Sequence, residues 1–95
     1  MSESQRFKSV WDALEDTPEE AENLKLRAEL MNAVRQLVAE RCLTQTEAAK
    51  QFGITQPRLN DLLRGRIDRF SLDALVNILA RAGKHVEVHL TNTAA

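Results

Sequence analysis

Several kinds of residue are scarce in the sequence, and each shortage limits what the chain can be. A single cysteine, Cys42, excludes an internal disulfide and is typical of a reducing compartment, so we expect a cytoplasmic protein and a small buried thiol. No apolar run reaches the length of a membrane span, and residues 1–16 hold no secretory signal, so no membrane contact is expected. Three glycines and two prolines among 95 residues favour one compact, mainly helical domain.

Charge is nearly balanced overall but unevenly placed. The formal net charge is −1; residues 1–40 carry five Lys or Arg against nine Asp or Glu, whereas residues 41–95 carry eight against five. An acidic front joined to a basic middle indicates two kinds of contact surface. Ordinary solvated charge explains the same distribution, so both interpretations stay open on this feature alone.

Residues that could carry out chemistry are few, and their spacing does not suit it. On an extended segment, His85 and His89 would lie about 13 Å apart, which favours a surface strand over a metal site. The acidic cluster at Glu19, Glu20 and Glu22 stands where a helix N-terminus attracts negative charge. The sequence shows no Ser/His/Asp or Cys/His arrangement and no phosphate-binding glycine loop. We therefore expect no enzyme, no cofactor and no metal.

Hydroxyl side chains mark the predicted helix starts. The segment TPEE at residues 17–20 is a capping box, and it opens a helix that continues to about Arg41. Some 24 residues give a rod of about 36 Å, so the first half of this helix is expected to project. Its apolar residues at helical spacing are Leu26, Leu30, Ala33 and Leu37. Three further helices are expected after the caps Thr44, Thr55 and Ser71, the last ending at Gly83.

The pattern changes period after Gly83. Val86, Val88 and Leu90 alternate with polar residues, which predicts a short β-strand. A lone strand cannot satisfy its own backbone, so these three residues are expected to form a dimer interface with the same strand of a second copy. The predicted divisions are an N-terminal arm over residues 1–16 with one short helical turn around Trp11, a helical domain over 17–83, and a strand and tail over 84–95.

The middle of the chain reads QTEAAKQFGITQPRLNDLL, with a glycine between two short helical patterns. Residues 45–52 and 56–64 are joined by Gly53-Ile54-Thr55, which predicts a helix-turn-helix. The turn would hold the second helix out at an angle with a polar face, and such a helix fits the major groove of DNA. The alternative is an ordinary helical hairpin. The complete spacing, followed by Arg64-Gly65-Arg66, favours DNA binding.

This stretch resembles the phage repressor and Cro family of helix-turn-helix domains, also called the Xre family. The layout of PEEAE, a long helix, LTQTEAAKQFGITQPRLNDLLRG, IDRFSLDAL and a terminal strand is similar to the branch that includes HigA-type antitoxins. The resemblance covers about residues 9–90. The turn motif is specific for the superfamily, whereas free-standing repressors share the antitoxin layout.

The resemblance implies roles for residues of the motif. Gln45 would contact a phosphate and brace Gln56, whose amide would bond to an adenine edge. Pro57 would touch a thymine methyl, and the arginines would grip phosphates without reading sequence. Asp61 departs from the pattern, because a carboxylate at DNA needs a cytosine amine or a nearby arginine as its partner, Arg58 or Arg64. The residues expected at the DNA are Gln45, Thr55, Gln56, Pro57, Arg58, Asn60, Asp61, Arg64 and Arg66.

The expected fold is an all-α, Cro/repressor-like helix-turn-helix bundle with a short C-terminal β-strand. Such a protein would act as a homodimer on double-stranded DNA, at a palindromic operator with half-sites about 34–36 Å apart. The resemblance implies a sequence-specific repressor of its own operon that is the antitoxin of a type II toxin–antitoxin module, and residues 1–30 are candidates for binding the toxin. Two alternatives stay open: a stand-alone regulator without a toxin, and a protein-interaction module whose helix-turn-helix is purely structural.

Overall fold

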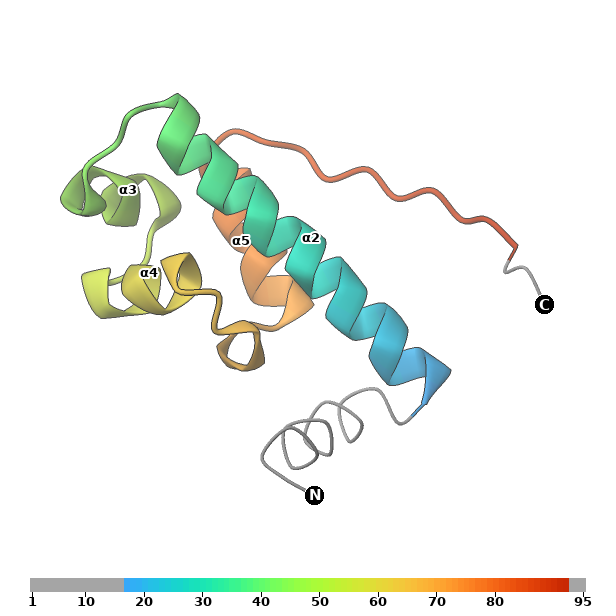
Figure 1. Cartoon of the computed structure of the whole chain (residues 1–95). Helices are drawn as coiled ribbons and strands as arrows, with labels where there is room; N and C mark the ends of the chain where they lie inside the picture. Colours follow the sequence, from blue (N-terminus) through green and yellow to red (C-terminus); the bar gives the residue numbers. More distant parts are fainter. Residues whose placement is uncertain (1–16, 93–95) are drawn as a thin grey trace, which may run out of the picture.

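The computed structural model describes residues 17–92 of the chain, and this part contains four α-helices and one 3-10 turn (Figure 1). In chain order they are α2 (Pro18–Glu40), α3 (Gln45–Phe52), α4 (Gln56–Leu63), η1 (Ile67–Arg69) and α5 (Leu72–Arg81). The helical turn predicted around Trp11 lies outside the described residues. Among the described helices, none combines the length and the apolar character needed to cross a bilayer.

Each α-helix begins at a hydroxyl cap that the sequence predicts. The side-chain oxygen accepts a hydrogen bond from the backbone N–H three residues later, at 3.0 Å in α2 and 3.3 Å in α4. In α3 the Glu47 carboxylate also accepts from the Thr44 N–H at 2.9 Å, which completes a capping box. The four caps are Thr17, Thr44, Thr55 and Ser71. A cap of this kind stabilises a helix by about 1 kcal/mol, so these positions were predictable from local sequence.

Each of these helices also ends in a left-handed residue. Three of the four are glycines, whereas α2 ends with Cys42 at a φ of 52°. Cys42 N–H bonds to Ala39 O at 3.2 Å and Leu43 N–H to Val38 O at 3.1 Å, which is the Schellman pattern that normally takes glycine. Cys42 is exposed, so the prediction of a buried thiol is wrong. The side chain points outward because this tight ending, and not core packing, determines the position.

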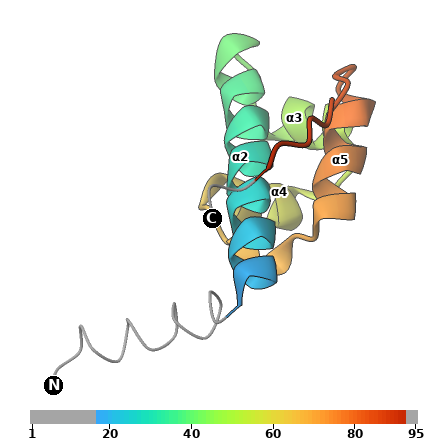
Figure 2. The ribbon, with the colours of Figure 1, turned by 90° about the vertical axis from the view of Figure 1, so that its right-hand side faces the viewer.

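The core lies between α2 and α5, which run in the same direction, with α3 and α4 against one side of the pair (Figures 1 and 2). At one end Arg41 Nη2 donates to Ala82 O at 2.9 Å, and at the other Arg27 Nη1 donates to Ile67 O at 3.0 Å. The second bond ties the middle of α2 to η1, and the turns of α2 before Arg27 extend past α5 (Figure 1). The buried cluster comprises Met31, Val34, Leu37, Ala48, Ala49, Phe52, Leu59, Leu62, Phe70, Leu75, Ile78, Leu79 and Ala82.

The predicted C-terminal strand is wrong, because residues 17–92 contain no strand. Residues 84–92, here called the C-terminal arm, follow α5 without regular structure and lie on the other side of the α2–α5 pair from α3 and α4 (Figure 2). Val86 is half-buried against the core, while Val88 and Leu90 are 77% and 92% exposed. A strand needs a neighbour for its backbone hydrogen bonds, and no other extended segment lies beside the arm in the described chain.

Candidate nucleic-acid interface

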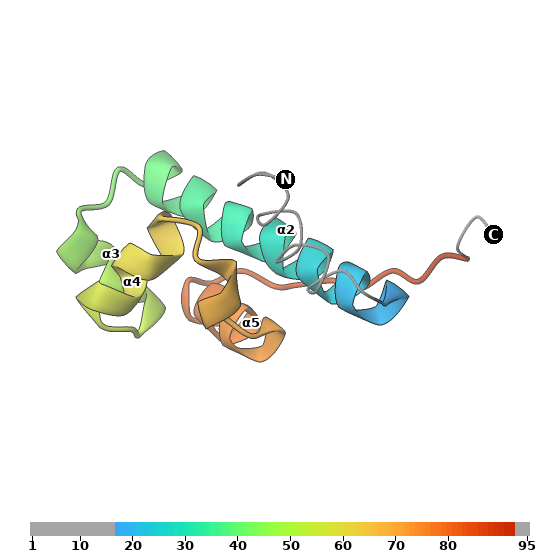
Figure 3. The same ribbon diagram turned by 60° about the horizontal axis from the view of Figure 1, so that its bottom comes forward.

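The motif that the sequence predicts folds as two separate helices. Gly53 has a φ of 70° and stands between α3 and α4, so the chain turns there and does not continue as one rod. A side chain at this position is disfavoured by the left-handed backbone, and a Cβ would also displace the exposed end of the Arg81 side chain, whose Nε lies 2.5 Å from where that Cβ would be. Seen from below, α3 and α4 cross near the C-terminal end of α2 (Figure 3). The predicted helix-turn-helix is therefore confirmed.

The two faces of α4 differ sharply. Leu59 and Leu62 are fully buried and anchor the helix in the core. Four of the residues expected at the DNA are exposed on the other side: Gln56, Pro57, Asn60 and Arg64. The amide side chains are thus open to solvent, as a helix that enters a groove requires.

Gln56 is held by a neighbour that the sequence interpretation did not select. Its Nε2 donates to Thr46 Oγ1 at 3.1 Å, across the junction between α3 and α4. Gln45 was expected to brace this amide; it is exposed at the first position of α3, and no hydrogen bond joins it to Gln56 in the described chain. One Nε2 hydrogen and the Oε1 atom of Gln56 remain free, and these are the donor and acceptor that an adenine edge needs.

Arg58 folds back onto the protein. Its guanidinium lies 4.3 Å from the centre of the Phe70 ring, and its Nη1 donates to Arg69 O at 3.1 Å. Both contacts belong to the segment after α4, so Arg58 fixes α4 to η1. In this conformation it does not project toward a phosphate with Arg64, although the two looked equivalent in the sequence.

Asp61 is also engaged with the segment after α4. Its carboxylate accepts from Arg69 Nη1 at 3.2 Å and lies 4.0 Å from Arg66 Nε. The partners expected within the helix, Arg58 and Arg64, are not used. Asp61 therefore needs no cytosine amine to compensate its charge, because two arginines beyond the helix end supply that compensation.

A basic edge remains exposed beside α4. Arg66 and Arg69 keep 42% and 51% of their side chains exposed despite their pairing with Asp61. Arg64 is exposed, and Arg35 reaches this edge from α2, with its Nη1 3.7 Å from where a Cβ on Gly65 would be. Arg35 and Arg69 were missed by the sequence interpretation, because they lie outside the motif and only the path of the chain brings them to it.

Within residues 17–92, no three His, Cys, Asp or Glu side chains are grouped as metal ligands would be. His89 Nε2 lies 3.5 Å from Glu87 Oε1 on the C-terminal arm, where both side chains are largely exposed.

Comparisons with known proteins agree with this geometry. A family described as "Helix-turn-helix domain" (HTH_37) matches residues 13–91. A solved structure of a protein named as a proposed XRE-family transcriptional regulator superimposes with a TM-score of 0.72 at 25% identity, covering 79% of this chain and 84% of that one. A search of curated proteins gave no significant match. Both matches point to a DNA-binding regulator and not to an enzyme. The chain belongs to this helix-turn-helix domain family, and its motif is of the Xre type.

Proposed function

We propose that this protein, an Xre-type helix-turn-helix regulator that binds DNA, is a sequence-specific repressor and the antitoxin of a toxin–antitoxin module that represses its own operon. The observation that carries the DNA-reading part is the N-terminal turn of α4. There Gln56 stands exposed, with its amide held by Thr46 and with one donor and one acceptor free. A held amide loses less conformational entropy on binding, which favours a bidentate bond to adenine.

Other residues of the motif support two different tasks. Pro57 and Asn60 share the exposed face of α4 and reach the same groove, where Pro57 can contact a thymine methyl. Gln45 and Thr55 stand at the N-termini of α3 and α4, where backbone N–H groups suit phosphate binding. Arg64 and Arg66 add charge that binds any sequence. We assign Arg58 and Asp61 a positioning role and not a contact with bases.

The DNA-reading part is tested with the DNA upstream of the protein's own gene. Gln56→Ala is expected to lose about 1–3 kcal/mol of discrimination at one base pair, because it removes the bidentate donor and acceptor. Arg64→Ala is expected to weaken binding to all sequences alike. Fluorescence anisotropy on operator and scrambled duplexes, at two salt concentrations, separates the two effects. Equal losses on both duplexes for both variants would reject the assignment of Gln56.

The repressor is proposed to act as a homodimer. An eight-residue recognition helix reads only a few base pairs, and two copies on successive major grooves extend the site to a palindrome with half-sites about 34–36 Å apart. Val86, Val88 and Leu90 of the C-terminal arm are the proposed dimer contacts, since two of the three are exposed apolar side chains.

The antitoxin role is supported by the resemblance of the whole layout to the HigA-type branch. Such a role requires a surface for a toxin outside the motif, proposed within residues 1–30. Purification from the native host provides the test: a small basic protein encoded by the neighbouring gene should copurify and should lose its toxicity in the presence of this chain. A regulator that copurifies with no such protein, yet still binds its own promoter, would reject the antitoxin role and leave DNA binding intact.

A further inference from the structure

One side of the α2–α5 pair carries an apolar stripe that nothing within residues 17–92 covers completely. Leu26, Leu30, Ala33 and Leu37 follow each other at steps of four, three and four residues, so they share one face of α2. Leu37 is 5% exposed, Leu30 and Ala33 are half-buried, and Leu26 is 45% exposed. The stripe is thus covered at its C-terminal end and becomes open toward its N-terminal end.

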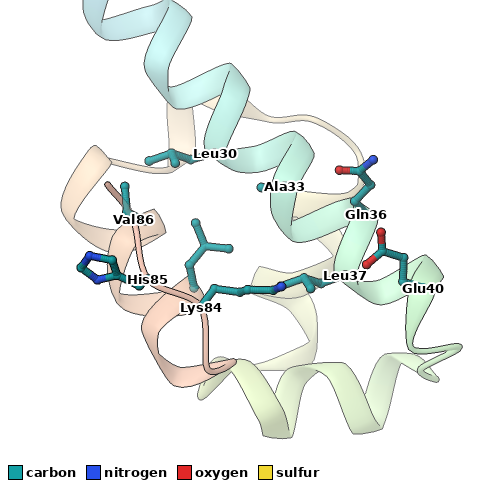
Figure 4. A pocket seen from close by; sticks show the side chains of 9 residues that line it. Leu30, Ala33, Gln36, Leu37, Glu40, Lys84, His85 and Val86 are labelled. Atoms are coloured by element: carbon teal, nitrogen blue, oxygen red, sulfur yellow. The ribbon is translucent and has the colours of Figure 1, made fainter. Parts of the chain in front are cut away.

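A groove of about 340 Å³ lies along this stripe. Residues of α2 form one wall, and the start of the C-terminal arm forms the other, with Val86 opposite Leu30 (Figure 4). Its apolar lining is Leu30, Ala33, Leu37, Leu79 and Val86. The polar residues at the rim include Glu40 and Lys84, which carry opposite charges, so the rim has no single sign that would repel a second copy.

The same chain carries side chains that fit such a groove. In an extended segment, alternate residues point the same way, so Val88 and Leu90 continue the line that begins with Val86. Val86 already lies against its own groove, whereas Val88 and Leu90 extend beyond it and are 77% and 92% exposed. Two large apolar side chains exposed together on one arm indicate a surface that becomes buried on association.

We propose that Val88 and Leu90 of one copy enter the groove beside Leu30 and Ala33 of a second copy, and that the exchange is reciprocal. A two-fold interface uses the same patch on both subunits, so one chain must carry both the protruding element and the cavity that receives it. This chain carries both. The arm lies on the other side of the α2–α5 pair from α3 and α4 (Figure 2), so the contact leaves the recognition helix uncovered. The inference rests on the proposed homodimer and identifies what fills the groove.

The first test measures dimerisation of the full chain by sedimentation velocity over a range of concentrations. Val88→Ser/Leu90→Ser is expected to lower the association constant by about 100-fold or more, because each substitution acts on both arms of the dimer. His89→Ser is the matched control, since it lies on the same arm but points to the opposite side. A wild-type chain that stays monomeric, or a double variant that dimerises as the wild type does, would overturn the proposal.

The second test asks whether the arm meets a groove or another arm. Ala33→Phe fills the groove and leaves the arm intact, so its homodimer should also be weakened. Mixing Ala33→Phe with Val88→Ser/Leu90→Ser leaves one intact arm facing one intact groove, and the mixture should form a heterodimer stronger than either homodimer. Failure of the mixture to associate would overturn the exchange, and an Ala33→Phe homodimer as strong as the wild type would overturn it in favour of pairing between arms. Far-UV circular dichroism identifies folded variants, and Ala33→Met replaces Ala33→Phe if the larger side chain prevents folding.

DNA binding separates this inference from the proposed function. If the arm variant dimerises as the wild type does and still binds the operator, the inference is overturned and the repressor role is supported. Dimerisation through the arm, together with equal binding to operator and scrambled DNA, would support the inference and reject the repressor role.

Discussion

Arg58 and Arg64 look alike in the sequence, and the structure predicts opposite consequences for their removal. Arg58→Ala removes a cation–π contact with Phe70 at 4.3 Å and a charged hydrogen bond to Arg69 O at 3.1 Å. Such contacts at a half-buried position contribute about 1–2 kcal/mol together, which corresponds to a fall in Tm of about 10 °C for a domain of this size. Arg64→Ala removes an exposed side chain with no hydrogen bond or ion pair in the described chain, so its free energy of unfolding should change by about 0.5 kcal/mol or less.

For DNA binding we expect the opposite: Arg64→Ala should have the larger effect and Arg58→Ala the smaller one. If Arg64 contacts one phosphate, its loss reduces the slope of log K against log salt by about 0.9 per protomer, whereas Arg58→Ala leaves the slope unchanged. Urea unfolding gives the stability of each variant, and fluorescence anisotropy below 15 °C gives the slope while Arg58→Ala is still folded. A fall in salt slope for Arg58→Ala equal to that for Arg64→Ala, without loss of stability, would refute the structural role of Arg58.

Three further predictions concern local features of the fold and site. Cys42→Gly should be more stable than Cys42→Ala by about 0.5–1 kcal/mol in its free energy of unfolding, because glycine adopts the left-handed φ of 52° without strain. Chemical denaturation measures this difference, and equal stability of the two variants would contradict the prediction. Gly53→Ala should lower the free energy of unfolding by about 1–2 kcal/mol, because it places a Cβ on a left-handed backbone, while the exposed end of Arg81 can move aside; an unchanged Tm would count against this. Thr46→Val should reduce discrimination at the base pair read by Gln56 more than Gln45→Ala does, as measured by competition between duplexes; the reverse order would restore Gln45 as the brace.

Local interactions explain which parts of the fold were predictable from the sequence. A helix cap joins residues three apart, so Thr44 with Glu47 could be found without knowing the path of the chain. The turn at Gly53 was equally local. Cys42 was missed because a left-handed helix end usually takes glycine, and nothing beside Cys42 in the sequence marks the exception.

The terminal strand was mispredicted for a different reason. Alternation at Val86, Val88 and Leu90 reports which side of an extended segment is apolar, but pairing depends on a second segment that the pattern does not contain. One chain offers no such segment within its described residues, so the arm is extended but is not a strand. The pattern correctly identified the apolar side of the arm and wrongly assigned its secondary structure.

The site was predictable in its position but not in its internal contacts. The partners of Arg58 and Asp61 lie five to twelve residues further along, past the end of α4 and Gly65 and in or beside η1, where no periodic rule applies. These contacts matter because α4 has only two turns and would not be stable alone. Its buried leucines anchor it in the core, and Thr46 holds the Gln56 side chain at its N-terminus. Arg58 and Asp61 join the helix to η1. Charged residues of a recognition helix can therefore fix its orientation on the protein. The segment that follows the helix determines which of these residues are left free to contact DNA.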